Sequence, residues 1–116
     1  MALAFVLDSR LQNLSFQARS SSIYLVSPDL ARGEFLFQQT CSSCHPQGNN
    51  VIVKERNLKK EALKKFIFLE DENTIVNFVK DNNFHRGALA FAGKLSKQDF
   101  ADVASFVYDQ AMEDKW

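Results

Sequence analysis

Apolar residues recur at intervals of three and four positions in four stretches of the chain. Such spacing places them on one face of an α-helix. The predicted helices cover 28–40, 58–68, 72–80 and 97–112. No stretch shows the sustained alternation of apolar and polar residues that indicates a half-buried strand. The sequence therefore predicts an all-α fold of about four helices joined by loops.

The first and last of these helices have recognisable starting signals. Ser27 is predicted to cap the first helix, with Pro28 at its first position and Asp29 in its first turn. Ser96 and Asp99 resemble a capping box ahead of the last helix, with Asp in place of the usual Glu or Gln. Turn-forming residues predict a loop over 46–50 and an end to the third helix at Asp81, Asn82 and Asn83.

The first and last helices are expected to cross. Leu30, Gly33 and Phe37 share one stripe of the first helix. Gly33 has no side chain and would let another helix approach closely, with Phe37 one turn further on against the partner. The predicted buried stripe of the last helix consists of Phe100, Val103, Ala104, Val107 and Ala111.

The strongest chemical signal is the run Cys41-Ser42-Ser43-Cys44-His45 at the end of the first helix. Each thiol can bond a vinyl group on the same edge of a porphyrin, and the following His can bind the iron. The alternatives are a disulfide, a redox-active Cys pair and half of a zinc site. The chain has no second CxxC for a zinc site and no βαβ pattern for a thioredoxin-like motif. The motif therefore predicts one covalently attached haem c.

Composition adds little to this picture. The chain has 11 Phe but only one Trp and two Tyr, and these rings suit a porphyrin pocket or an ordinary small core equally. Its 14 basic and 14 acidic residues balance, so the overall charge gives no case for nucleic-acid binding. Basic residues gather over 54–65 and acidic ones over 70–72 and in the last helix. Such charge can steer docking to a partner or simply solvate helix faces.

Residues 1–27 are expected to be a leader-like or poorly ordered segment, and 28–116 to form the domain. Covalent haem attachment usually takes place on the outer side of an energy-transducing membrane, so export is expected. However, the apolar run over 1–7 is short, and Asp8 and Arg10 follow it, unlike a standard signal peptide. No stretch approaches the roughly 18 apolar residues of a membrane span, so an integral membrane protein is not expected.

The run over 29–116 resembles the small class I cytochromes c, and most closely cytochrome c6, the luminal electron carrier of cyanobacterial and algal photosynthesis. The matching segments are 33–37 (GEFLF), the CSSCH motif, 48–52 (GNNVI), 58–63 (LKKEAL), 89–95 (LAFAGKL), 102–107 (DVASFV) and 114–116 (DKW). The resemblance implies that the helices cross near Gly33 and Phe37 beside one haem. One edge of that haem would be exposed for electron transfer.

The resemblance also implies roles for the motif residues. Cys41 and Cys44 would form the thioether bonds, and His45 would be the proximal iron ligand. The protein would be a soluble, monomeric one-electron carrier rather than an enzyme, located in the thylakoid lumen or the periplasm. Its redox partners would be a cytochrome b6f-like donor and a photosystem I-like acceptor.

The chain departs from the family pattern at the sixth iron ligand. The family has a Met just before its LAF or PAF segment, and alignment without a gap places Ala88 there. An Ala side chain cannot bind iron. The family also has a Gln in the preceding helix, where this chain has Phe78 beside Asn77. Loss of the thioether would remove its contribution to a high redox potential.

Three arrangements remain for the sixth site. His85 lies in the same loop and would give bis-His coordination, unless it is a solvated loop residue. An empty or water-filled site would instead suit a haem-based sensor of small ligands, a weak peroxidase or a structural haem subunit. Met112 is the third candidate, although its distance along the chain favours core packing or surface exposure.

Overall fold

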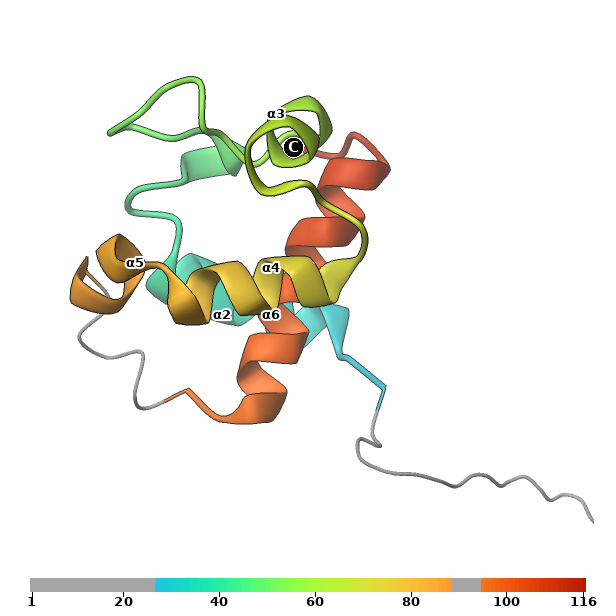
Figure 1. Cartoon of the computed structure of the whole chain (residues 1–116). Coiled ribbons are helices and arrows are strands. Elements are labelled where there is room, and N and C mark those ends of the chain that lie inside the picture. The colour runs from blue at the N-terminus through green and yellow to red at the C-terminus, as the bar shows by residue number, and fades with distance from the viewer. Residues whose placement is uncertain (1–26, 89–94) are drawn as a thin grey trace, which may run out of the picture.

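Figure 1 shows the computed structural model of the chain, which describes residues 27–88 and 95–116. Every regular element within these residues is a helix, which confirms the all-α prediction. The elements are α2 (Leu30–Thr40), a short 3₁₀ helix (Pro46–Gly48), α3 (Lys60–Ile67), α4 (Glu72–Asp81), α5 (Asn83–Ala88) and α6 (Lys97–Met112). The helix α5 was not predicted, because the asparagines before it were interpreted only as the end of α4.

The last helix begins and ends where the sequence predicts. The Ser96 hydroxyl accepts the Asp99 N–H, and the Asp99 carboxylate accepts the Ser96 N–H, both at 3.0 Å. This reciprocal pair satisfies two backbone donors that the first turn leaves without partners. A second capping box, between Asp71 and Thr74, begins α4.

The predicted start of the first helix is wrong by two residues. Asp29, not Ser27, is the N-cap of α2, and its carboxylate accepts the Arg32 N–H at 3.1 Å. The N–H of Asp29 donates to the Asp102 carboxylate of α6 at 2.9 Å. This contact from a distant helix fixes the place where α2 begins, and no signal near residue 27 reports it.

The crossing of α2 with α6 forms the centre of the fold, and Figure 1 draws these helices in teal and in orange to red. A Cβ atom on Gly33 would lie 2.1 Å from the Asp102 carbonyl oxygen and 2.9 Å from the Phe106 Cβ. The backbones therefore approach too closely for any residue other than glycine, as the sequence predicts. The Asp102 side chain is buried at this crossing and also accepts the Gln98 amide at 2.9 Å.

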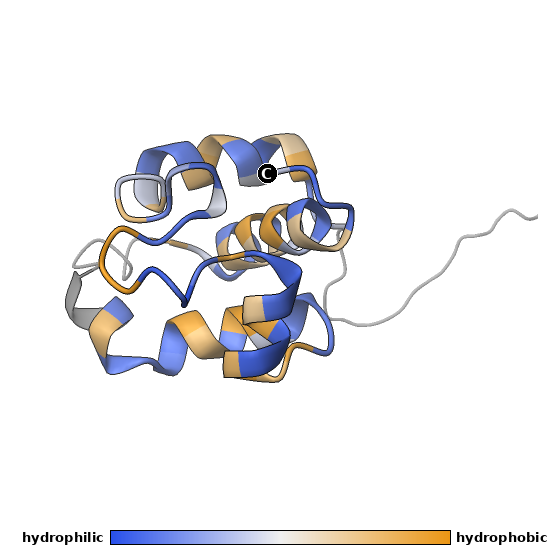
Figure 2. Cartoon of the chain, turned by 90° about the horizontal axis from the view of Figure 1, so that it is seen from above, coloured by the Kyte–Doolittle hydropathy of each residue, from blue (hydrophilic) through white to orange (hydrophobic). Residues whose placement is uncertain are grey.

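Aromatic rings fill the space beside this crossing. The Phe37 ring, which is only 1% exposed, lies 5.5 Å from the Phe106 ring and 5.3 Å from the Trp116 ring. The Trp116 indole N–H donates to the Leu58 carbonyl at 2.9 Å. The connected core consists of Phe37, Leu63, Leu69, Ile75, Ala104, Phe106, Val107 and Ala111. Figure 2 shows the apolar and hydrophilic bands that these residues and their neighbours make along the helices.

The predicted buried stripes are correct in part. In α2, Gly33 and Phe37 are buried, but Leu30 is 45% exposed. In α6, Ala104, Val107 and Ala111 are buried as predicted, whereas Phe100 and Val103 are half-buried.

The helix α4 packs against α6 and also contacts α3 and α5. Because α5 follows α4 after a single residue, Asn82, the path of α4 determines where α5 lies. Within 27–88 and 95–116, no helix has the length and apolar character needed to cross a membrane.

Candidate haem site

The CxxCH segment leaves the C-terminal end of α2 in a continuous turn. Cys41 caps this helix, and its N–H donates to the Phe37 carbonyl at 2.8 Å. The N–H groups of Cys44 and His45 both donate to the Cys41 carbonyl, at 3.2 and 2.9 Å. Both cysteines are half-buried, and neither forms a disulfide. The turn therefore holds two free thiols and an imidazole at the end of a helix anchored in the core.

The Cys41 thiol is kept in its protonated form. Burial raises its pKa above the ordinary value of 9.0, the Thr40 hydroxyl opposes this, and Cys44 adds to the increase. The Thr40 hydroxyl donates to the Leu36 carbonyl at 2.6 Å, and its oxygen lies 3.3 Å from the Cys41 sulfur. This contact fixes the direction of the thiol.

The ring of His45 presents one free nitrogen. Its Nδ1 lies 2.8 Å from the Asn49 carbonyl oxygen. A carbonyl only accepts, so Nδ1 carries the proton and Nε2 keeps a free lone pair. Burial lowers the pKa of His45, and the Asn49 carbonyl opposes this shift. The imidazole is therefore neutral and suited to bind a metal through Nε2.

The loop after His45 brings the Asn49 carbonyl into position. Gln47 and Gly48 have positive φ angles of 53° and 81°, and together they turn the chain back toward the motif. A Cβ on Gly48 would lie 2.4 Å from the Trp116 ring, so the indole closes over this turn. The loop thus accepts a hydrogen bond from the His45 ring on one side and packs against the indole of Trp116 on the other.

His85 lies on the short helix α5 rather than in a loop, and it is half-buried. Its backbone N–H and its Nδ1 both lie 3.0 Å from the same Asn82 side-chain atom. A backbone N–H can only donate, so that atom is the amide oxygen, and Nδ1 must also donate to it. The Nε2 of His85 is therefore free. Burial lowers the pKa of His85, and the nearby His45 lowers it further.

The rings of His45 and His85 lie close together and are nearly parallel. Their centroids are 6.4 Å apart, and their planes differ by 13°. A metal bound between two Nε2 atoms, with bonds of about 2.0–2.1 Å and ring radii of about 1.1 Å, separates the centroids by about 6.3 Å. The 6.4 Å separation of the His45 and His85 rings is close to this value, and their 13° angle is compatible with such a pair.

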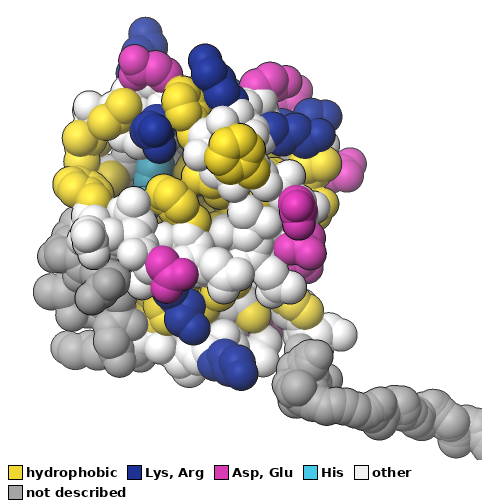
Figure 3. Space-filling model, in the orientation of Figure 1, with side chains coloured by type: hydrophobic (Ala, Val, Ile, Leu, Met, Phe, Trp, Pro, Cys, Tyr) yellow, Lys and Arg dark blue, Asp and Glu magenta, His cyan; other side chains and the backbone are white. Residues whose placement is uncertain are grey.

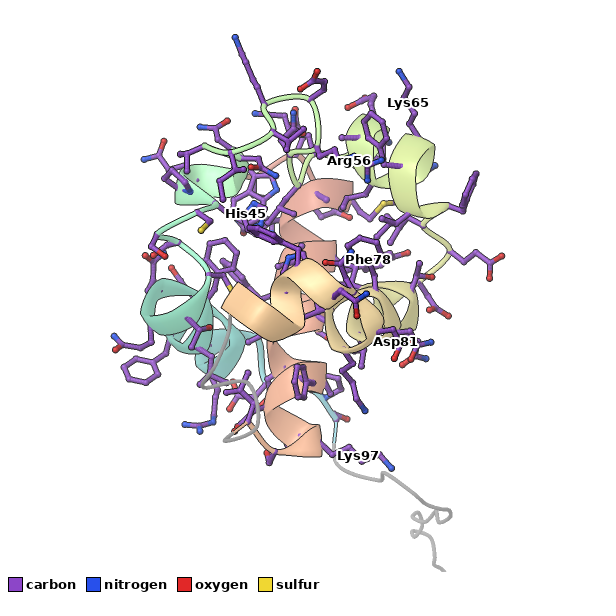
Figure 4. The ribbon with its side chains drawn as sticks, turned by 60° about the vertical axis from the view of Figure 1, so that its left-hand side comes forward. His45, Arg56, Lys65, Phe78, Asp81 and Lys97 are labelled. Atoms are coloured by element: carbon purple, nitrogen blue, oxygen red, sulfur yellow. The ribbon has the colours of Figure 1, made fainter. Side chains whose placement is uncertain are left out.

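Two phenylalanine rings surround His85. Phe78 of α4 lies 5.7 Å from its ring at 75°, and Phe84 lies 6.2 Å from it at 86°. Both angles are typical of favourable edge-to-face contacts. Figure 4 shows His45 on the segment that follows α2 and Phe78 on α4. The position that departs from the family's Gln therefore contacts the candidate sixth ligand.

Apolar side chains border this region. Val51, Ile52 and Val53 are 63%, 55% and 42% exposed, and the Val51 N–H donates to the Cys44 carbonyl at 3.0 Å. Figure 3 shows a histidine set back among hydrophobic side chains on one face of the molecule. Free thiols on one turn, two neutral imidazoles and apolar surroundings together fit a covalently bound haem.

The structure brings all four predicted site residues together. Cys41, Cys44 and His45 lie on one turn, and the His85 ring on α5 lies 6.4 Å from the His45 ring. Met112 packs against the hydrophobic core, as its core-packing alternative requires. The predicted LAF segment at 89–91 lies outside the described residues. Sequence reasoning missed Asn82, although an Asn directly before a short helix is a signal for an N-cap.

Comparisons with known proteins point to the cytochromes c. Residues 28–107 match the family model described as cytochrome c oxidase, cbb3-type, subunit III. Cytochrome c6 of Tetradesmus obliquus is 36% identical over 91 residues, which cover 78% of this chain and 100% of the relative. Cytochrome c6 of Petalonia fascia is 40% identical over 86 residues, which cover 73% of this chain and 96% of the relative.

Solved structures of cytochromes of the c6 type have a similar fold. Cytochrome c6 from the diatom Phaeodactylum tricornutum superposes with a TM-score of 0.66 at 36% identity, covering 76% of this chain and 99% of that one. Reduced Arabidopsis thaliana cytochrome 6A superposes with a TM-score of 0.65 at 25% identity, covering 74% and 96%. With the CxxCH turn and the fold in place, this chain belongs to the class I cytochromes c, as a cytochrome c6-like electron carrier with one covalently bound haem c.

Proposed function

We propose that the protein is a one-electron carrier in which two histidines, His45 and His85, are the axial ligands of the haem iron. The near-parallel rings, with centroids 6.4 Å apart, carry the proposal. Each ring also has its Nδ1 bound to an oxygen of its own, at Asn49 and at Asn82. Such partners orient ligating imidazoles and make them more basic.

Each motif residue has a role in this proposal. Cys41 and Cys44 form the thioether bonds, and His45 is the proximal ligand at the end of the same turn. The haem supplies reversible exchange of one electron between ferric and ferrous iron. A nitrogen ligand from His85 in place of a thioether sets a lower potential than a Met-ligated relative has. The chain itself tunes this exchange and docks its partners, and it is not an enzyme.

The physiological setting is a further part of the proposal. The cytochrome c6 relatives support a role in photosynthetic electron transport, in the thylakoid lumen or the periplasm. A cytochrome b6f-like donor and a photosystem I-like acceptor are the redox partners by the same likeness. The working unit is a monomer formed by 28–116, with 1–27 as a leader-like segment.

The test of the ligand set is spectroscopic. Purified haem-containing protein is expected to be low-spin in the ferric state, and its ferrous form is expected to bind CO slowly. His85→Ala should convert the ferric form to high-spin and open the ferrous form to rapid CO binding. Asn83→Ala, at an exposed position of the same helix, is the matched control and should behave as the wild type.

Two outcomes would overturn the proposal. A wild type that is high-spin and binds CO rapidly has an open sixth site and acts as a ligand sensor or a peroxidase. An unchanged low-spin spectrum in His85→Ala would assign the sixth ligand to another residue.

A further inference from the structure

Asn82 joins two helices through its backbone and its side chain. Its N–H donates to the Phe78 carbonyl at 2.9 Å and so caps the C-terminal end of α4. Its side-chain oxygen accepts the backbone N–H of His85 at 3.0 Å, in the position of an N-cap for α5. One residue therefore ends α4 and begins α5, which carries the candidate sixth ligand.

The same oxygen holds the His85 ring. The ring Nδ1 lies 3.0 Å from Asn82 Oδ1, and the backbone N–H on the same atom identifies it as oxygen. A cap needs only the backbone bond. The second bond removes one of the two ring nitrogens from metal binding and leaves Nε2 as the available ligand.

We infer that Asn82 is a positioning residue for the sixth ligand: its amide oxygen sets the tautomer and the plane of the His85 ring so that Nε2 faces the metal. This inference rests on the proposed function. An oxygen acceptor on the far nitrogen is the usual means of orienting a ligating imidazole, and its loss typically weakens metal binding by about 10–100-fold. Asn82 therefore acts on the iron only through His85.

The neighbouring rings complete this arrangement. Phe78 and Phe84 stand at 75° and 86° to the His85 plane, so they restrict its rotation but offer no acceptor for its N–H. Only Asn82 Oδ1 is within hydrogen-bond distance of Nδ1 among the contacts of the described residues. If this hydrogen bond sets the plane of the His85 ring, the 13° angle between the His85 and His45 planes depends on it.

Two substitutions separate positioning from capping. Asn82→Ser keeps a good N-cap residue, but its hydroxyl is one bond closer to the backbone. We therefore expect the cap to survive and the hydrogen bond to the His85 ring to be lost. Asn82→Asp keeps an oxygen that can accept both hydrogen bonds and places a negative charge beside the ring N–H. Ser96→Ala, which removes the cap of another helix, α6, is the control for lost stability alone.

The measurements are the ferric spin-resonance spectrum, the CO affinity of the ferrous form and the midpoint potential of the haem-containing protein. In Asn82→Ser we expect the signal of parallel imidazole planes to change and the CO affinity to rise about 10–100-fold. In Asn82→Asp we expect a low-spin form with a lower midpoint potential than the wild type, because charge on the acceptor increases imidazole basicity. Ser96→Ala should match the wild type in all three.

The outcomes distinguish this inference from the proposed function. If the wild type shows bis-His coordination and both Asn82 variants match it in spectrum, CO affinity and potential, Asn82 is only a cap and the inference fails alone. If Ser96→Ala changes the spectrum as much as Asn82→Ser, lost stability explains the effect, and the inference again fails. If the wild type itself lacks a bis-His spectrum, the proposed function and this inference fail together.

Discussion

Gly33→Ala is expected to destabilise the protein because it places a methyl group between two helices in contact. The new Cβ would lie 2.1 Å from the Asp102 carbonyl oxygen, where ordinary contacts begin at 3.4 Å. The α6 backbone would have to retreat by about 1.3 Å, and overpacking of this kind costs about 1–3 kcal/mol. The atom in contact belongs to the backbone of α6 and not to a flexible side chain, so we expect the free energy of unfolding to fall by about 3 kcal/mol from this contact.

Helix propensity acts in the opposite direction. Alanine is favoured over glycine inside a helix by about 0.5–1 kcal/mol. The steric term is larger, so the net loss is about 2 kcal/mol, which corresponds to about 8–16 °C in melting temperature for a domain of 60–100 residues. The displacement would also strain the hydrogen bond from the Asp29 N–H to Asp102 and the contact of Phe37 with Phe106.

Urea unfolding of the haem-containing protein, followed by circular dichroism, measures this loss. The midpoint should fall with an unchanged slope. Glu34→Ala, at an exposed position of the same helix, is the control and should stay within about 0.5 kcal/mol of the wild type. A Gly33→Ala protein as stable as this control, or more stable than the wild type, would refute the close crossing of α2 and α6.

Two further predictions concern the indole of Trp116 and His85, the proposed sixth ligand. Trp116→Ala removes the contact with Phe37 and the hydrogen bond to Leu58, and it should lower the free energy of unfolding by about 3 kcal/mol. Trp116→Phe should lower it by only about 1 kcal/mol, because only the hydrogen bond is lost. Equal losses of the two variants in urea unfolding would contradict this prediction. Burial and His45 lower the pKa of His85 below its ordinary value of 6.5, so below pH 6.5 the unfolded chain binds a proton that the folded chain does not, and stability falls as the pH drops. The melting temperature should therefore decrease as the pH is lowered from about 7.5 to about 5.5, and it should decrease less in His85→Ala. An equal decrease in the wild type and in His85→Ala would show that His85 is not the cause.

Local signals predicted the helices whose ends depend on nearby residues. The box of Ser96 with Asp99 is complete within four residues, and α6 begins where it predicts. The start of α2 instead depends on Asp102, which lies 73 residues along the chain from Asp29. A buried carboxylate on α6 is also contrary to the ordinary expectation for a charged residue, so the sequence pattern gave no reason to place it at the crossing.

The candidate site residues can be named from the sequence, but their geometry cannot. Spacing alone identifies Cys41, Cys44 and His45, because thioether chemistry requires that pattern. His85 was one of several alternatives, since no local pattern reports its distance from His45. The short helix that brings the two rings together begins at Asn83, directly after the residue that ends α4, and a single asparagine with two roles cannot be recognised from spacing.

The two histidines differ in what holds them, and this difference has a consequence for how such a protein can diverge. His45 is oriented by a main-chain carbonyl, that of Asn49, which every amino acid at position 49 would supply. His85 is oriented by the amide of Asn82, which a single codon change can replace. If both histidines bind the iron as proposed, mutation can change the environment of one ligand while the other stays the same. The redox potential could then diverge in related chains without loss of the CxxCH turn.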